Sequence, residues 1–331
     1  MADRFRGWQV VDDAGKPRLD WRTDLALEDL ADGDVVIDVS HASFNYKDGL
    51  ALTGKAPIIR RFPCVPGIDL AGTVLESQGR GLARGDVVLV TGFGLGETHD
   101  GGFAERARVR REWVMKVPPP FTAVQAMAIG TAGFTAMLAV QALEQQGVER
   151  PAEVLVTGAG GGVGSMAVAL LAAAGFAPVA VTGRAELEPY LRELGAVRVL
   201  PRSAVASSGK GPLDKAQWAA AIDTVGGPFL ADLLKAMRYE GTVAACGLVG
   251  GADLPTTVYP FILRGVRLIG IDSVQQPMFK RDAAWGRLAV LLDADRLGRM
   301  TRTVALPDLP KTAEEILAGQ VRGRVVVEVK A

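Results

Sequence analysis

The residues best suited to chemistry lie in the stretch 154–164, VLVTGAGGGVG, where five glycines follow a short apolar run. Glycine lets the backbone approach a pyrophosphate closely, and the N-terminus of a following helix offers N–H donors and a positive dipole end. The spacing is Ala159-x-Gly161-x-x-Gly164, with an additional Gly158 in the turn. A glycine run alone is a weak signal, and a glycine-rich turn without a ligand is the alternative interpretation.

The flanks of this stretch favour a dinucleotide site. Val154–Val156 is typical of a buried parallel strand, and the Ala/Leu-rich run 165–174 is typical of a helix that ends at Gly175. Strand, glycine turn and helix in this order predict a Rossmann domain.

The end of the next predicted strand, 178–182, indicates which dinucleotide is bound. In this fold a carboxylate at that point holds the ribose 2′-OH of NAD, but here the strand ends in Thr182-Gly183-Arg184. A hydroxyl and a guanidinium suit a 2′-phosphate, and Arg202 offers a second cation. Although both arginines could be ordinary solvated charges, we expect NADPH rather than NADH.

The remaining pattern predicts two domains in the 331 residues. Residues 1–122 consist mainly of short strands and turns, which suggests a β-barrel-like domain. Helices are expected at 123–129, 132–146, 187–194, 229–237 and 285–292. Beyond 154–156, further strands are expected at 178–182, 197–200, 218–223, 241–247 and 266–272, which makes a doubly wound parallel sheet. A last strand at 325–329 is expected to return to the first domain.

Composition excludes several classes of function. Lys+Arg and Asp+Glu both number 37, and without a dominant basic tract we expect no nucleic-acid partner. No uninterrupted apolar run approaches the ~20 residues of a membrane helix, and Met1–Gln9 has no apolar stretch typical of a secretory signal. Cys64 and Cys246 are the only cysteines, which suits a reducing compartment. We therefore expect a cytoplasmic protein that does not enter a membrane.

Metal and nucleophile chemistry lack suitable residues. A zinc dehydrogenase would carry Gly-His-Glu where this chain has Gly67-Ile68-Asp69, and no C-x-x-C pair is present. The two histidines are His41 and His99; the latter lies in a glycine-rich loop and is expected to be a loop residue rather than a catalytic acid. Cys246 ends a buried strand and is expected to pack rather than react. No G-x-S-x-G elbow supports hydrolase chemistry.

Several motifs together resemble a known family. They are Asn45–Asp48, Pro66–Val74, Gly130–Ala136 and the glycine loop, followed by the more specific strings at 221–226, 244–248, 254–258, 260–264 and 270–274. From about residue 5 to its end the chain is similar to the zinc-independent medium-chain dehydrogenase/reductases, in the quinone oxidoreductase branch. Within that branch it resembles the NADPH-dependent acryloyl-CoA reductases.

The resemblance implies a fold and a set of contacts. The fold would be a chaperonin-10-like β-barrel catalytic domain (1–122 and 275–331) and a Rossmann domain (123–274), in a homodimer joined through the sixth strands. Two departures from relatives, Thr182 and Gly160 in place of serines, leave a hydroxyl and backbone donors available. The implied cofactor contacts are Tyr46, Gly160, Gly161, Gly162, Val163, Thr182, Gly183, Arg184, Arg202, Leu248, Ile262, Ser273 and Arg324.

The resemblance also implies a reaction, the reduction of acryloyl-CoA to propanoyl-CoA by hydride transfer from NADPH to the β-carbon. Tyr46 and Asn45 are expected in a loop facing the nicotinamide, with Tyr46 orienting it or relaying a proton. Tyr46 packing only against the cofactor is the equal alternative, and Asp48 is expected to accept hydrogen bonds from backbone. The rival functions are a quinone or 2-alkenal reductase and a non-catalytic NADPH-binding protein.

Overall fold

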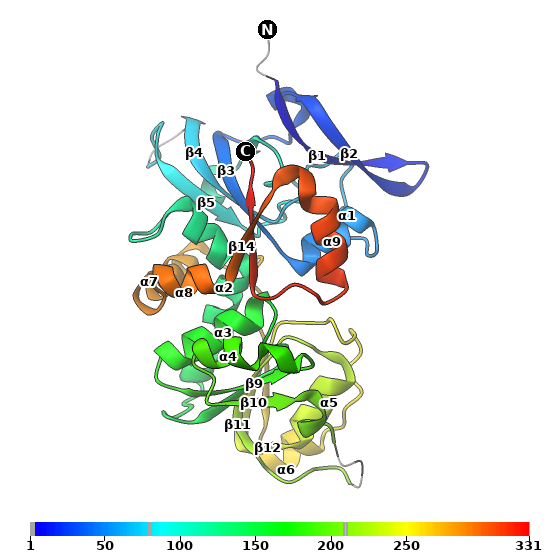
Figure 1. Cartoon of the computed structure of the whole chain (residues 1–331), viewed down its shortest axis with the longest axis vertical. Helices are drawn as coiled ribbons and strands as arrows, with labels where there is room; N and C mark the ends of the chain where they lie inside the picture. Colours follow the sequence, from blue (N-terminus) through cyan, green and yellow to red (C-terminus); the bar gives the residue numbers. More distant parts are fainter. Residues whose placement is uncertain (1–3, 79–80, 208, 210, 331) are drawn as a thin grey trace. The chain divides into compact units, whose positions relative to one another are not determined.

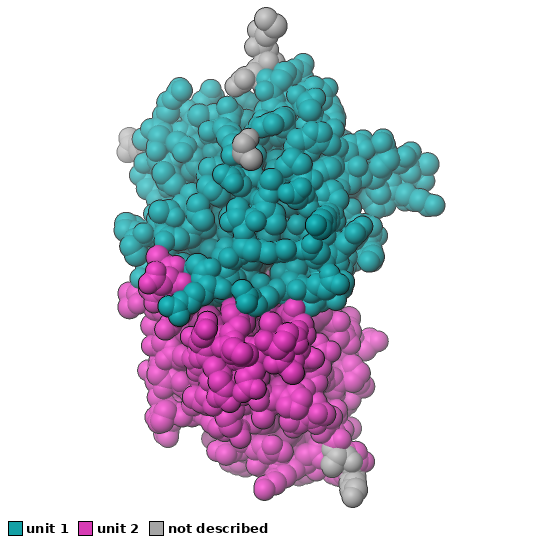
Figure 2. All heavy atoms as spheres, viewed as in Figure 1, with its two compact units in different colours: residues 1–131, 274–289, 297–331 teal, residues 132–273, 290–296 magenta. Residues whose placement is uncertain are grey.

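The computed structural model describes residues 4–78, 81–207, 209 and 211–330 (Figure 1). Residues 1–3 of the N-terminal stretch predicted to lack a signal lie outside this range. Two units divide the chain, as Figure 2 shows: unit 1 is Met1–Thr131, Val274–Ala289 and Leu297–Ala331, and unit 2 is Ala132–Ser273 and Val290–Arg296. The first boundary lies later than the predicted 122/123, because the residues up to Thr131 bond to unit 1.

Unit 1 is built on a seven-stranded sheet of order β14-β15-β3-β4-β5-β7, in which β6 also pairs with β3, and on a separate β1-β2 hairpin. The predicted return of the last strand is confirmed, because β15 pairs antiparallel with β3 and Val326 lies opposite Ser43. Helix α9 contacts α1, and both were missed from the sequence (Figure 1). The strands are β1 Phe5–Asp13, β2 Lys16–Leu25, β3 Val35–Phe44, β4 Asp69–Ser77, β5 Val87–Thr91, β6 Arg106–Val109, β7 Met115–Lys116, β14 Thr301–Ala305 and β15 Arg324–Glu328. The helices are α1 Tyr46–Thr53, α7 Met278–Leu291, which runs into unit 2, α8 Ala294–Arg299 and α9 Leu309–Leu317.

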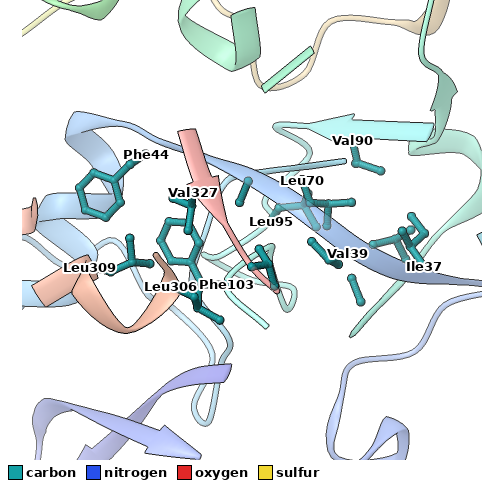
Figure 3. Close-up of a cluster of buried hydrophobic side chains, with 14 of the residues drawn as sticks. Ile37, Val39, Phe44, Leu70, Val90, Leu95, Phe103, Leu306, Leu309 and Val327 are labelled. Carbon is teal, nitrogen blue, oxygen red and sulfur yellow. The ribbon is translucent and has the colours of Figure 1, made fainter. Parts of the chain in front are cut away.

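The core of unit 1 fixes the ends of β3 and β4. Most residues of β3 are buried, and Phe44 at its end stacks on Phe103 with ring centroids 5.7 Å apart. Figure 3 shows this cluster, to which β4 contributes Leu70 and β15 contributes Val327. The polar residues that follow or flank these apolar anchors are thereby held in one register.

Unit 2 is a six-stranded, wholly parallel sheet of order β10-β9-β8-β11-β12-β13, which confirms the predicted doubly wound Rossmann topology. Strand order reverses between β8 and β11, the point where this fold binds its ligand. The strands are β8 Glu153–Val156, β9 Ala177–Thr182, β10 Arg198–Pro201, β11 Trp218–Asp223, β12 Met237–Ala245 and β13 Arg267–Gly270. The helices are α2 Ala123–Gln145, which begins in unit 1, α3 Gly162–Ala173, α4 Glu188–Glu193, α5 Gly227–Lys235 and α6 Tyr259–Arg264. Short 3-10 turns occupy Leu27–Asp29, Arg111–Trp113, Ala185–Leu187, Arg202–Ala204 and Leu306–Asp308.

Helix α2 supports the prediction of two adjacent helices. It is broken at Gly130 (φ 48°, ψ −159°), as the two predicted helices on either side require. Its length and mean hydropathy of 1.6 would suffice to cross a membrane, although polar residues such as Gln125, Thr131 and Gln141 interrupt its apolar sequence. The apolar window is 72% buried inside the protein, and a helix surrounded by core needs no polar face.

Candidate cofactor and active site

The glycine loop of unit 2 runs from the end of β8 to the start of α3 and is closely packed. A Cβ at Gly164 would lie 2.3 Å from the carbonyl oxygen of Gly158. Gly158 itself has φ +57°, and a Cβ there would lie 2.3 Å from Thr224 Oγ1. Ser165 Oγ bonds back to the carbonyl of Ala159 at 3.0 Å. The turn therefore admits only glycine at these points and leaves the first N–H groups of α3 for an anion.

A buried carboxylate that the sequence reasoning did not single out holds this loop in place. Asp223, at the end of β11, is fully buried and accepts hydrogen bonds from Thr157 Oγ1 (2.7 Å) and the Gly226 N–H (2.8 Å). Thr224 donates its N–H to Thr157 Oγ1 and its hydroxyl to the Thr157 carbonyl. Burial raises the pKa of Asp223, although the hydrogen bonds that its carboxylate accepts from Thr157 and Gly226 oppose the shift. The carboxylate joins the ends of β8 and β11 at the switch point.

Two arginines, Arg184 and Arg202, lie near the end of β9. Thr182 Oγ1 accepts the Arg184 N–H at 3.1 Å, and Arg184 Nη2 reaches the Gly160 carbonyl at 3.4 Å. Arg202 lies across Gly183, where a Cβ would be 3.1 Å from Nε. The Arg184 guanidinium therefore lies at the glycine loop and Arg202 beside Gly183, and two such cations with a hydroxyl near the end of β9 suit a phosphate.

The other expected contacts of unit 2 are more scattered. Leu248 follows β12, is 61% exposed, and has its Cα 3.2 Å from a Cβ placed at Gly226. Ile262 is 69% exposed on α6, while Ser273 is buried beyond β13. Leu248 therefore lies beside the turn that follows Asp223. Among the described residues, no hydrogen bond joins Ile262 to the glycine loop.

In unit 1, the predicted loop around Asn45 and Tyr46 is instead the start of helix α1. Asn45 has an extended backbone (φ −119°, ψ 165°), and its N–H donates to Asp48 Oδ2 at 2.8 Å. An Asn-x-x-Asp pattern is a capping signal that could have revealed this helix. Tyr46, its first residue, is half-buried, and its phenol has no hydrogen-bond partner among the described residues.

Asn45 and Arg324, two predicted site residues, lie in one buried polar cluster. Asn45 Nδ2 donates to Ser43 Oγ and to Asp69 Oδ2, both at 3.0 Å, and its Oδ1 accepts Arg324 Nη1 at 3.2 Å. Arg324 is 2% exposed and also donates to the carbonyl of Ala128 at 2.8 Å. Its predicted contact with a cofactor remains a prediction, since the guanidinium is engaged inside unit 1.

Asp48 completes this cluster and accepts backbone donors, as expected. Its Oδ1 receives the Ile68 N–H at 3.0 Å, in addition to the Asn45 bond. Burial, and secondly the charge of Asp69, raise the pKa of Asp48 to about 7.

The residues predicted to be structural have structural surroundings. His99 is buried, with Nε2 3.0 Å from the Asp32 carbonyl and Nδ1 3.1 Å from the Asp100 carbonyl, and it packs edge-on against Trp113. Burial raises the pKa of the Cys246 thiol to about 12, so the thiol stays protonated and is a poor nucleophile at neutral pH. Within the described part of the chain, no three His, Cys, Asp or Glu side chains are grouped as metal ligands.

Known proteins show the family. The models for an alcohol dehydrogenase GroES-like domain and a zinc-binding dehydrogenase match residues 31–119 and 162–286. The probable acrylyl-CoA reductase AcuI of Escherichia coli (strain K12) is 53% identical over 91% of this chain and 92% of its own length. This chain belongs to the medium-chain dehydrogenase/reductase family. Acrylyl-CoA reductase AcuI of Ruegeria pomeroyi is a further relative, 50% identical over 93% of both chains.

Solved structures of this medium-chain dehydrogenase/reductase family have the same fold. The YhdH oxidoreductase of Salmonella enterica in complex with NADP matches with a TM-score of 0.94 and 49% identity, over 98% of this chain and 100% of its own. YhfP of Bacillus subtilis with NAD bound matches with a TM-score of 0.93 and 43% identity, over 99% and 100%. The predicted GroES-like and Rossmann parts are thereby confirmed.

Proposed function

We propose that this protein reduces the 2,3 double bond of acryloyl-CoA to give propanoyl-CoA, with NADPH as hydride donor. The observation that carries the proposal is the 53% and 50% identity, across more than nine-tenths of the chain, to proteins named acrylyl-CoA reductase. The glycine loop and its cationic neighbours, both present here, supply the dinucleotide chemistry that such a reaction needs.

NADPH is the proposed cofactor because the end of β9 carries Thr182 and Arg184, with Arg202 beside it, and no carboxylate. A relative solved with NADP supports the choice, whereas YhfP was solved with NAD. The fit is supported by the glycine turn, which leaves room for a pyrophosphate at the start of α3. The other proposed contacts are Tyr46, Gly160 to Val163, Gly183, Leu248, Ile262, Ser273 and Arg324.

Bound NADPH supplies a hydride. The residues of this chain would bind and orient it: the first N–H groups of α3 would hold the pyrophosphate, and Arg184 and Arg202 would hold the 2′-phosphate. Tyr46, whose phenol has no hydrogen-bond partner among the described residues, would orient the nicotinamide or donate a proton to the substrate. Zinc takes no part, because Ile68 stands where a zinc enzyme of this type carries histidine.

A homodimer in the cytoplasm is also part of the proposal. β13 is the last strand of its sheet, and the nearby apolar side chains of Val258, Ile262 and Leu263 are exposed, which supports pairing with a second copy. The two cysteines are free, which agrees with a reducing compartment.

The test follows NADPH oxidation at about 340 nm with acryloyl-CoA, crotonoyl-CoA and a simple quinone in parallel, with NADH as the control. Turnover of acryloyl-CoA that requires NADPH supports the proposal. Turnover of the quinone alone contradicts it and favours a quinone reductase, the second candidate, because YhfP is also named a putative quinone oxidoreductase. NADPH binding without any turnover indicates a non-catalytic protein.

The role of Tyr46 is tested by Tyr46→Phe, which keeps the ring and removes only the hydroxyl. If the phenol passes a proton, turnover falls about 100-fold while NADPH affinity stays the same. Unchanged turnover restricts Tyr46 to packing and orientation.

A further inference from the structure

We propose that Asp69 is a positioning residue, whose carboxylate fixes Asn45 and thereby places Tyr46 for the reaction. The inference rests on the proposed function, because Tyr46 is its point of action. Asp69 begins β4, is fully buried, and touches no part of the glycine loop in unit 2 through any described bond.

Asp69 collects donors from three separate segments of unit 1. Its Oδ2 accepts the Ser43 hydroxyl from β3, the Asn45 amide at 3.0 Å and the Thr131 N–H at 2.8 Å. Its Oδ1 accepts the Thr131 hydroxyl at 2.5 Å. One carboxylate therefore ties the end of β3, the start of α1 and the break in α2.

The sheet register explains why these residues meet. Ala42 lies opposite Leu70, so the next pair outward is Ser43 and Asp69. Val325 lies opposite Phe44, so Arg324 follows beside Asn45. The two antiparallel pairings deliver a carboxylate and a guanidinium to the same amide from opposite sides.

The side chain of Asn45 is committed to this cluster. Its Nδ2 faces Ser43, Asp48 and Asp69, and its Oδ1 accepts from Arg324. An amide held by protein groups on both ends is not open to a substrate, so Asn45 acts through position. The next residue along the chain is Tyr46, and the extended backbone of Asn45 sets the direction in which α1 starts.

Gly130 shows how little room the cluster has. A Cβ at Gly130 would lie 2.7 Å from Ser43 Oγ, 2.8 Å from Asp69 Oδ2 and 2.9 Å from Arg324 Nη2. The backbone at the break in α2 thus lies directly against the polar side chains of the cluster. Thr131 donates both its N–H and its hydroxyl to the Asp69 carboxylate. A rigid surround of this kind is what a positioning role requires.

The test compares kcat for acryloyl-CoA reduction in Asp69→Ala, which removes both acceptors, and Asp69→Asn. In the asparagine variant the amide oxygen can still accept from Ser43, Asn45 and the Thr131 N–H, while its NH2 donates to the Thr131 hydroxyl. We expect Asp69→Ala to lower kcat about 10- to 100-fold with NADPH affinity unchanged, and Asp69→Asn to recover most of the loss.

Asp100→Ala is the matched control. Asp100 is also a buried carboxylate of unit 1, held by the Val65 and Ala31 N–H groups and by Arg61, and it has no bond to Asn45. It should lose stability like Asp69→Ala but keep kcat within about twofold. A similar fall in kcat for both variants overturns the inference, because it would reflect general loosening of unit 1.

A double-mutant cycle with Tyr46→Ala separates position from structure. If Asp69 acts through Tyr46, Asp69→Ala costs far less kcat in the Tyr46→Ala background; equal costs in both backgrounds overturn the inference. If Asp69→Ala does not fold, Ser43→Ala, which removes one donor, decides by the same cycle on a smaller scale. Wild-type protein that fails to reduce acryloyl-CoA contradicts only the proposed function. In that case the double-mutant cycle is measured by the fluorescence of bound NADPH instead of kcat. The inference then requires that Asp69→Ala and Tyr46→Ala change this fluorescence in the same way.

Discussion

Two buried carboxylates, one in each unit, accept hydrogen bonds from donors at a sharp turn, but the groups around them differ. Asp69 in unit 1 and Asp223 in unit 2 each accept a threonine hydroxyl, and each lies beside a glycine with positive φ. Those glycines are Gly130 at +48°, beside Asp69, and Gly226 at +72°, whose N–H donates to Asp223. In both places the carboxylate satisfies donors that a sharp turn would otherwise leave buried and unpaired.

The difference lies in the charges nearby. Asp69 belongs to a cluster that also holds Arg324 and a second acid, Asp48, whereas Asp223 accepts only from neutral hydroxyl and N–H groups. Burial of a lone carboxylate raises its pKa, as for Asp223, and a second charge adds to the shift, as for Asp48. Neutral donors are enough to join two parallel strands at Asp223, while the junction of β3, α1 and the break in α2 brings together two acids and an arginine.

The largest expected effect comes from filling the turn beside Asp69. Gly130→Ala should lower the free energy of unfolding by about 3 to 5 kcal/mol, because the added methyl meets three polar atoms as well as left-handed strain. Urea unfolding of the whole chain measures it. Gly147→Ala, at φ +74° with nothing within 4 Å, isolates the strain and should cost about 1 kcal/mol. Equal losses of unfolding free energy in Gly130→Ala and Gly147→Ala would show that the cluster around Asp69 can accommodate the added methyl group.

The next effect contrasts how the two acids respond to pH. The pKa of Asp48 is about 7 in the folded protein, above its unfolded value near 4, so the folded state binds more protons between these limits. Stability should therefore fall as pH rises from about 4 to about 7, by up to about 1.4 kcal/mol per pH unit, and level off above. Asp48→Asn should flatten this slope more than Asp223→Asn does, as thermal unfolding across pH would show. A larger change from Asp223→Asn would reverse the comparison.

A smaller effect concerns the cationic end of β9 in unit 2. Arg184→Ala should weaken NADPH binding about 10- to 150-fold, because a charged hydrogen bond to phosphate contributes about 1.5 to 3 kcal/mol, and should leave NADH binding unchanged. Isothermal titration with both dinucleotides measures the ratio. Lys215→Ala, an exposed cation elsewhere in the same unit, is the control. Parallel losses for NADPH and NADH would remove the assigned 2′-phosphate contact.

The two regions also differ in how far the sequence reveals them. The strands of unit 2 are short apolar runs with glycine-rich ends, and the loop, Thr182 and Arg184 are neighbours along the chain, so local patterns suffice. The cluster around Asp69 joins residues 43, 45, 48, 69, 131 and 324, and only the pairing register of β3, β4 and β15 brings them together. Helix α1 was missed because its eight residues include Gly49 and Thr53, which are poor helix formers.

The register of β15 also has a consequence for how the chain assembles during synthesis. Arg324 reaches Asn45 only after the 142 residues of unit 2 between Ala132 and Ser273 have been translated. All strands of the dinucleotide-binding sheet are therefore synthesised before Arg324 can donate to Asn45. The β3 edge of unit 1 therefore stays without its β15 partner until the last residues of the chain have been made.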